Sequence, residues 1–167
     1  MALSMRQAAS RAASGGPAAT STDGMLSSAE TQTMSVDAAI VLAFVLPERR
    51  SRHLGFLESK RGRVKFRKHL AHFKDCDPRF TAAIPPGQQT AQGIETLLWQ
   101  YGAPETCTII SESQDLDGVV MALPDALRKI VGYGAGSIIS CLEGRLAYYE
   151  GEEPGCRYAL RRAGRQP

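Results

Sequence analysis

The chain lacks the short motifs that identify most small enzymes and metal proteins. Its 167 residues include four cysteines but no Cys-x-x-Cys pair, which argues against a zinc ribbon or a thioredoxin-like dithiol. No Gly-x-Ser-x-Gly sequence is present, so a serine nucleophile on a strand-to-helix turn is not indicated. No helix-turn-helix, zinc-finger or RNP spacing is recognised either. No short motif in the sequence therefore identifies an activity.

Long apolar runs and a large net charge are also lacking. The apolar run Ala38–Leu46 is shorter than the roughly 20 residues that a membrane-spanning helix needs. The apolar fraction is 43%, the charged fraction is 22% and the formal net charge is +3, which are values typical of soluble globular proteins. This composition excludes a wholly disordered chain, a collagen-like fibre and a polytopic membrane protein. We expect a soluble, cytoplasmic protein.

The first 34 residues differ in composition from the rest of the chain. Ala, Ser, Thr and Gly dominate there without apolar periodicity, so the segment cannot bury enough surface to offset its ordering entropy. We expect residues 1–34 to form a disordered tail. The alternative is organellar import through residues 1–22, because they contain two arginines and no acid. Residues 35–162 then form a single α+β domain, and residues 163–167 a short C-terminal tail.

Helical signals precede strand signals along the predicted domain. Apolar spacing, capping residues and prolines predict helices over residues 36–46, 47–59, 63–74 and 90–101 and after Pro124. Short apolar runs predict strands over residues 107–111, 137–142, 145–150 and 156–160. Residues 78–88 are predicted to be an extended connection. This order predicts N-terminal helices packed on one face of a small, mostly antiparallel three- to four-stranded C-terminal sheet.

Two adjacent tyrosines lie on one of the predicted strands. Because successive strand residues point to opposite faces, Tyr148 and Tyr149 cannot both face the same layer. We expect one ring to be packed in the core and the other to be exposed. An exposed tyrosine could serve a protein–protein interaction surface, since its large ring makes contact at low entropy cost.

Positive charge is concentrated between Arg49 and Lys74. This segment holds ten Lys and Arg residues and one acid, a formal charge of +9, whereas the whole chain carries +3. Clustered cations indicate a polyanion site, because neutralised phosphates release their counterions. A solvated helical face and pairing with the protein's own acidic loops are the alternatives. The candidate polyanion-binding residues are Lys60, Arg61, Arg63, Lys65, Arg67 and Lys68.

An acidic loop after the strand 107–111 is the candidate catalytic site. Its carboxylates Glu112, Asp115 and Asp117 could hold Mg²⁺ through oxygen ligands. Such a site beside a basic helix would suggest phosphodiester cleavage. An ordinary solvated turn is the alternative, because Asp and Gly are common turn residues and the loop does not have EF-hand spacing.

A second candidate metal site consists of His69, His72 and Cys76. If the helix continued that far, the three residues would share one face and could hold zinc. Pro78 disfavours helix at this point, so packing of the histidines is the alternative.

The sequence thus predicts a small binding protein without catalytic activity or cofactor. Its basic helical region is expected to contact nucleic acid or another acidic partner, and its oligomeric state is left open. A magnesium-dependent phosphodiesterase or nuclease and a protein–protein interaction module are the alternative functions.

Overall fold

The computed structural model describes residues 34–162, so the predicted tails, apart from Met34, lie outside the described residues. Within this range the chain forms five α-helices, three short 3₁₀ helices and one six-stranded sheet. The helices are α1 (Val36–Phe44), α2 (Pro47–Leu57), α3 (Lys60–His69), α4 (Ala91–Gln100) and α5 (Leu123–Ile130), with η1 (Leu70–His72), η2 (Pro78–Phe80) and η3 (Pro86–Gln88). The strands are β1 (Thr81–Ala83), β2 (Thr106–Ser111), β3 (Val120–Ala122), β4 (Ser137–Leu142), β5 (Leu146–Glu150) and β6 (Arg157–Arg161).

The sheet has the order β1-β6-β5-β4-β2-β3, and every neighbouring pair is antiparallel. The predicted α+β class is confirmed, but the prediction of three to four strands is wrong. The two additional strands are the edge strands β1 and β3, each of three residues. A three-residue strand is too short to show an alternating apolar pattern, so β1 was hidden in the predicted extended connection.

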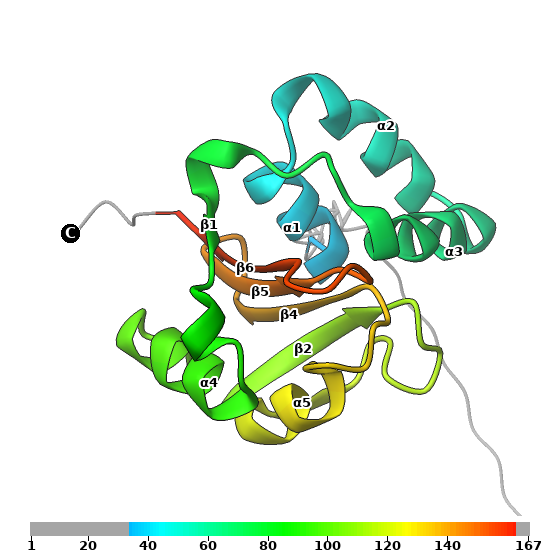
Figure 1. Ribbon diagram of the computed structural model, residues 1–167. Helices are drawn as coiled ribbons and strands as arrows, with labels where there is room; N and C mark the ends of the chain where they lie inside the picture. The colour runs from blue at the N-terminus through cyan, green and yellow to red at the C-terminus, as the bar shows by residue number, and fades with distance from the viewer. Residues whose placement is uncertain (1–33, 163–167) are drawn as a thin grey trace, which may run out of the picture. The chain divides into compact units, whose positions relative to one another are not determined.

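Helices cover both faces of the sheet, which corrects the predicted one-sided packing (Figure 1). Helices α1 to α3 cover one face, where Phe44 and Phe66 belong to one apolar cluster with Ile138 of β4. Helices α4 and α5 cover the other face, where Leu98 and Leu127 belong to one apolar cluster with Ile139. No helix within residues 34–162 is long and apolar enough to cross a membrane.

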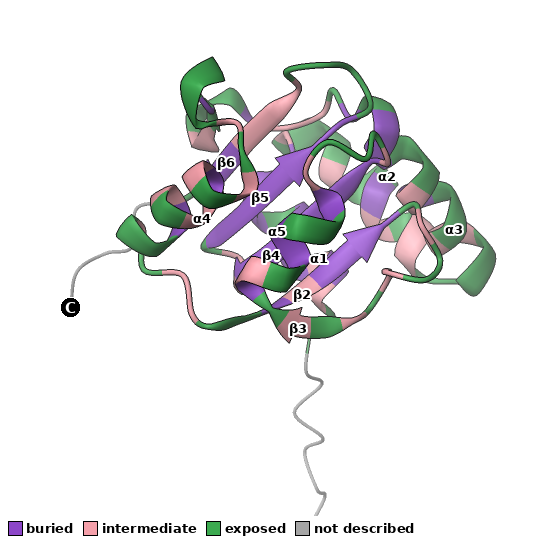
Figure 2. Cartoon of the chain, turned by 60° about the horizontal axis from the view of Figure 1, so that its bottom comes forward, coloured by how far each residue is buried: buried purple, intermediate pink, exposed green. Residues whose placement is uncertain are grey.

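The central strands are therefore buried on both sides (Figure 2). Tyr148 and Tyr149 do point to opposite faces, but their exposed fractions are 0% and 1%, so the expected exposed tyrosine is wrong. Each face of β5 meets its own helical layer, so both rings are packed. The Tyr149 hydroxyl donates to the Leu70 carbonyl at 2.8 Å and accepts from the Phe73 amide at 3.1 Å. These bonds fix the segment after α3 on the sheet.

Side-chain caps set the starts of three helices. Ser35 and Thr90 accept hydrogen bonds from Ala38 and Gly93, as the capping pattern predicts. Ser59 caps α3, which therefore begins at Lys60 rather than at the predicted Arg63. The additional first turn places two more cations on the helix.

Gly55 offers a simple test of the packing around α2. It lies in the helix interior, and a Cβ built there meets no atom within 4 Å. We expect Gly55→Ala to raise the free energy of unfolding by about 0.5–1 kcal/mol, because alanine loses less backbone entropy in a helix. Urea unfolding measures this change. Gly62→Ala should instead destabilise the protein, since its Cβ would lie 2.2 Å from the Phe56 carbonyl oxygen. A stabilised Gly62 variant would contradict this packing.

Candidate functional site

Two of the candidate polyanion-binding residues point into the protein. Arg63 and Arg67 lie one turn apart on α3, and both bind the carboxylate of Asp117 in the loop after β2. Arg67 Nη1 donates to Asp117 Oδ2 at 2.8 Å. Arg63 also donates to both oxygens of Asp37 in α1, at 3.2 and 3.3 Å. The inner face of α3 is therefore joined to α1 and to the acidic loop by ion pairs.

Asp117 is the centre of this network. Its side chain is 7% exposed, and its Oδ1 also accepts from the Ser111 amide at 3.2 Å. The hydrogen bond to Asp117 raises the pKa of Arg63, and Asp37 raises it further, although partial burial opposes both effects. Arg63 is thus held in its charged form by carboxylates of the same chain.

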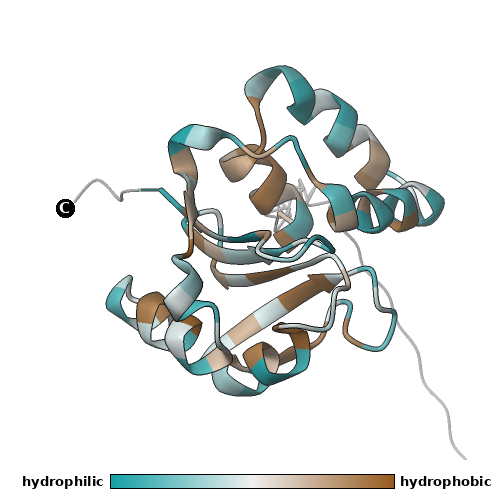
Figure 3. Cartoon of the chain, in the orientation of Figure 1, coloured by the Kyte–Doolittle hydropathy of each residue, from teal (hydrophilic) through white to brown (hydrophobic). Residues whose placement is uncertain are grey.

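The remaining candidates of α3 are exposed to solvent. Lys60, Arg61, Lys65 and Lys68 are exposed, and none of them takes part in an ion pair of residues 34–162. At 100° per residue, the last three lie within a sector of about 60° around the helix axis. Figure 3 shows α2 and α3 as predominantly hydrophilic helices. The surface formed by Arg61, Lys65 and Lys68, with Lys60 exposed at the start of the helix, is called the outer α3 face below.

The acidic loop does not bring its three carboxylates together around one point. Asp117 faces the arginines of α3, whereas Glu112 and Asp115 are exposed. In the part of the chain that the structure describes, no group of three or more His, Cys, Asp or Glu side chains could hold a metal ion. Magnesium-dependent catalysis by this loop stays a prediction.

The residues of the second candidate metal site lie on three different segments. His69 ends α3 and stacks on Phe56, with ring centroids 5.7 Å apart. His72, in η1, lies 3.3 Å from the Glu152 carboxylate. Cys76 forms an isolated bridge with Val45, and burial raises the pKa of its thiol to about 12. The chain leaves the α-helix at Leu70, so the helical spacing behind this prediction does not extend to Cys76.

A buried histidine of α2 is a residue that the sequence analysis missed. His53 is 3% exposed, and its Nε2 lies 2.7 Å from Asp75 Oδ2. Its ring also meets Phe66 and Phe73 edge-on, with centroids 5.8 and 5.3 Å apart. His53 thereby fixes the segment after η1 against α2. A lone histidine in a basic helix gave no signal of this role.

A buried ion pair on the opposite layer was missed as well. Glu150 is 2% exposed. Its carboxylate accepts hydrogen bonds from the Tyr148 hydroxyl at 2.5 Å and from the Gly132 amide at 2.8 Å, and it lies 3.3 Å from Arg157 Nη2. These bonds tie the loop after α5 to β5 and β6. The Glu150 carboxylate is satisfied by these partners, so we assign it a structural role.

Comparison of this chain with models of protein families, with curated proteins and with solved structures finds no match.

Proposed function

We propose that this protein binds a polyanion, with nucleic acid as the leading candidate, through the outer α3 face. The observation that carries the proposal is the division of α3 into two sides. Its inner arginines bind carboxylates of the same chain, while four exposed cations have no ion-pair partner within residues 34–162.

The arrangement of these cations is unfavourable without an anion. The sequence of α3 contains no acid, and Arg61 lies four residues before Lys65, so like charges are neighbours on the helix surface. Lys60 and Arg61 also occupy the first turn, where the helix dipole disfavours positive charge. A bound row of phosphates would relieve both effects. This electrostatic argument supports binding of the phosphate backbone rather than reading of bases.

A charge-removal variant tests this proposal directly. We expect the triple variant Arg61→Gln, Lys65→Gln and Lys68→Gln to bind a short single-stranded oligonucleotide about ten-fold or more weakly at low salt. The reason is that each lost cation removes a phosphate contact and its counterion release. Fluorescence anisotropy with a labelled DNA or RNA of mixed sequence measures the affinity.

The matched control removes the same number of charges elsewhere. Arg128 and Lys129 on α5 and Arg145 in the β4–β5 turn are exposed cations away from α3. Their triple substitution by glutamine is expected to change the affinity by less than about two-fold. An equal loss in both triple variants would show that net charge alone governs binding, and would contradict a site on α3.

A further inference from the structure

A cavity of about 450 Å³ lies beside β1 and β6, where the segment after α3 crosses the sheet. Three aromatic residues line it: Phe73 and Tyr149 are buried, and Tyr158 is partly exposed. The rings of Tyr149 and Tyr158 are nearly parallel, at 11°, with centroids 6.1 Å apart. Two thiols, of Cys76 and Cys156, complete the apolar part of the wall. This size and lining are typical of a small-molecule site.

The cavity wall is uncharged where a ring would lie. Burial raises the pKa of the Cys76 thiol to about 12, and the nearby thiol of Cys156 and carboxylate of Asp75 raise it further. At neutral pH Cys76 is therefore protonated and behaves as a small apolar group. A planar aromatic ligand meets no charge on this wall.

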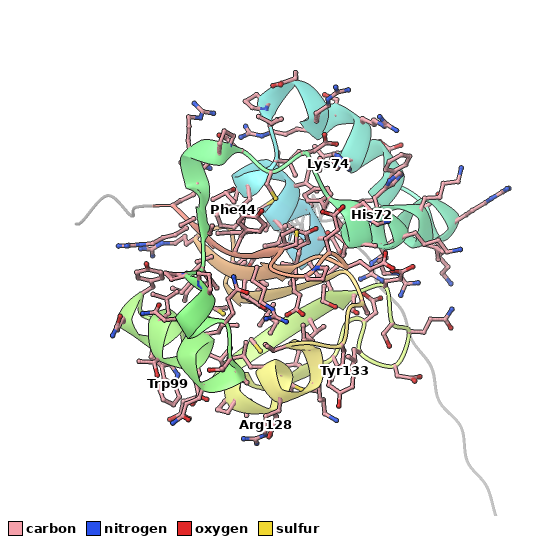
Figure 4. All side chains as sticks on the ribbon, viewed as in Figure 1. Phe44, His72, Lys74, Trp99, Arg128 and Tyr133 are labelled. Atoms are coloured by element: carbon pink, nitrogen blue, oxygen red, sulfur yellow. The ribbon has the colours of Figure 1, made fainter. Side chains whose placement is uncertain are left out.

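One lysine, Lys74, lies at one end of the cavity. His72 and Lys74 line it, and Figure 4 labels both on the segment that follows α3. Lys74 is exposed and takes part in no ion pair within the described range, whereas His72 lies beside Glu152. The one carboxylate that lines the cavity itself is that of Glu153.

A smaller hollow of about 140 Å³ adjoins this end. It shares His72, Phe73 and Lys74 with the cavity and adds Arg52 and His69. Its acid, Asp75, is already bound to His53 at 2.7 Å. His69 lies four residues after Lys65, so one residue of this hollow is a neighbour of the outer α3 face on the helix surface.

We infer that this cavity binds a nucleotide unit, with the base against the ring of Tyr158 and the phosphate on Lys74 and the neighbouring hollow. The inference rests on the proposed function, because it assigns the cavity to one unit of the anion that α3 attracts. Two sources share this chemistry: a free nucleotide, and a nucleotide of a single strand held on the outer α3 face. Aromatic stacking combined with a cationic groove is the usual way to bind such units.

A pair of neighbouring substitutions tests the cavity. Ala83 of β1 lines it, whereas Ala82 points to the opposite face of the sheet and lines a different hollow beside Tyr101. Both alanines are exposed edge-strand residues, so we expect Ala83→Phe and Ala82→Phe to have comparable effects on folding. Only the first should fill the cavity.

The probes are adenosine 5′-monophosphate, adenosine and inorganic phosphate, titrated into the full chain by calorimetry. We expect the monophosphate to bind at least about ten-fold more tightly than either of the other two, because only it engages both parts of the site. Ala83→Phe should weaken its binding about ten-fold or more, and Ala82→Phe should leave it unchanged. No binding of the monophosphate, or equal binding by both variants, would overturn the inference.

Labelling of Cys156 provides a second measurement that does not depend on a variant. Cys156 is half-buried and lines the cavity, so its maleimide reaction in the wild-type protein reports access to the cavity. Saturating adenosine 5′-monophosphate is expected to slow this reaction at least about three-fold. An unchanged rate would count against the assigned position.

The inference and the proposed function fail in distinguishable ways. The α3 triple variant should lose oligonucleotide binding but keep most of its affinity for adenosine 5′-monophosphate, because Arg61, Lys65 and Lys68 do not line the cavity. Oligonucleotide binding without monophosphate binding overturns the cavity alone. If the oligonucleotide displaces the monophosphate, the nucleotide belongs to the strand; if both bind together, the ligand is a free nucleotide.

Discussion

Asp117→Asn is expected to lower the free energy of unfolding by about 3 kcal/mol. The Asp117 side chain is 7% exposed and binds both Arg63 and Arg67, so the neutral amide leaves two guanidinium groups without their shared counter-charge. In this variant Arg63 still has its ion pair with Asp37, and the Arg63 side chain is 32% exposed. The expected loss of stability is therefore at the lower end of the range for buried ion pairs. Urea unfolding at neutral pH measures the change.

The other two carboxylates of the loop supply the control. Glu112→Gln and Asp115→Asn replace exposed groups, and each should change stability by less than about 0.5 kcal/mol. An Asp117→Asn variant with the stability of the wild type would contradict the ion-pair network. A rise in the wild-type melting temperature with Mg²⁺ that these two variants abolish would instead favour the metal-dependent alternative.

Gly136→Ala is expected to destabilise the protein by on the order of 4 kcal/mol or more, or to prevent folding. A Cβ at Gly136 would lie 2.1 Å from the Ala71 nitrogen and 2.2 Å from the Leu70 carbonyl carbon. Both atoms belong to the backbone of η1, so a change of side-chain rotamer cannot relieve the clash. The glycine lets β4 and η1 approach closely, and Ala71 lines the cavity described above.

Gly87→Ala is the matched control for this substitution. Its Cβ would meet no atom within 4 Å, so its effect should stay within about 0.5 kcal/mol. Soluble yield and urea unfolding of the two variants give the comparison. The extreme form of the expected result is an insoluble Gly136→Ala variant and a folded Gly87→Ala variant. A Gly136→Ala variant with the stability of the wild type would contradict the close approach of β4 and η1.

Local signals in the sequence predict the elements that local chemistry determines. Ser35 and Thr90 cap their helices, Pro47 begins α2, and the turn at Glu143-Gly144 joins β4 to β5. Capping, proline placement and turn residues act within a few residues, so a single sequence reveals them. The edge strand β1 has no comparable pattern, because its three residues are ordered by pairing with β6.

The two-sided burial of the sheet had a signal that the sequence analysis did not use. Residues 137–142 are apolar or small almost without interruption, and such a run is typical of a strand covered on both faces. The alternating pattern expected of a half-exposed strand is missing there. Reading this run as fully buried would have predicted a second helical layer.

The cluster of positive charge was visible in the sequence. The division of its residues into an inner and an exposed side of α3 was only partly predictable. Arg63 and Arg67 share a helix face with Phe66, which indicates that they lie toward the core. Their partner Asp117 is 54 and 50 residues away, so no local pattern could reveal the ion pairs. The cavity is formed by segments 71–78, 81–83 and 149–158. These segments are far apart in the sequence and lie together only in the folded chain.

The salt dependence of oligonucleotide binding tests the central claim most directly. We predict that the affinity of the wild-type protein for a short single strand falls with a log–log slope of about −2 to −3, because each neutralised phosphate contributes about 0.7. Fluorescence anisotropy from low to physiological salt measures this slope. An absence of binding at the lowest salt, or an affinity that does not change with salt, would contradict polyanion binding by α3.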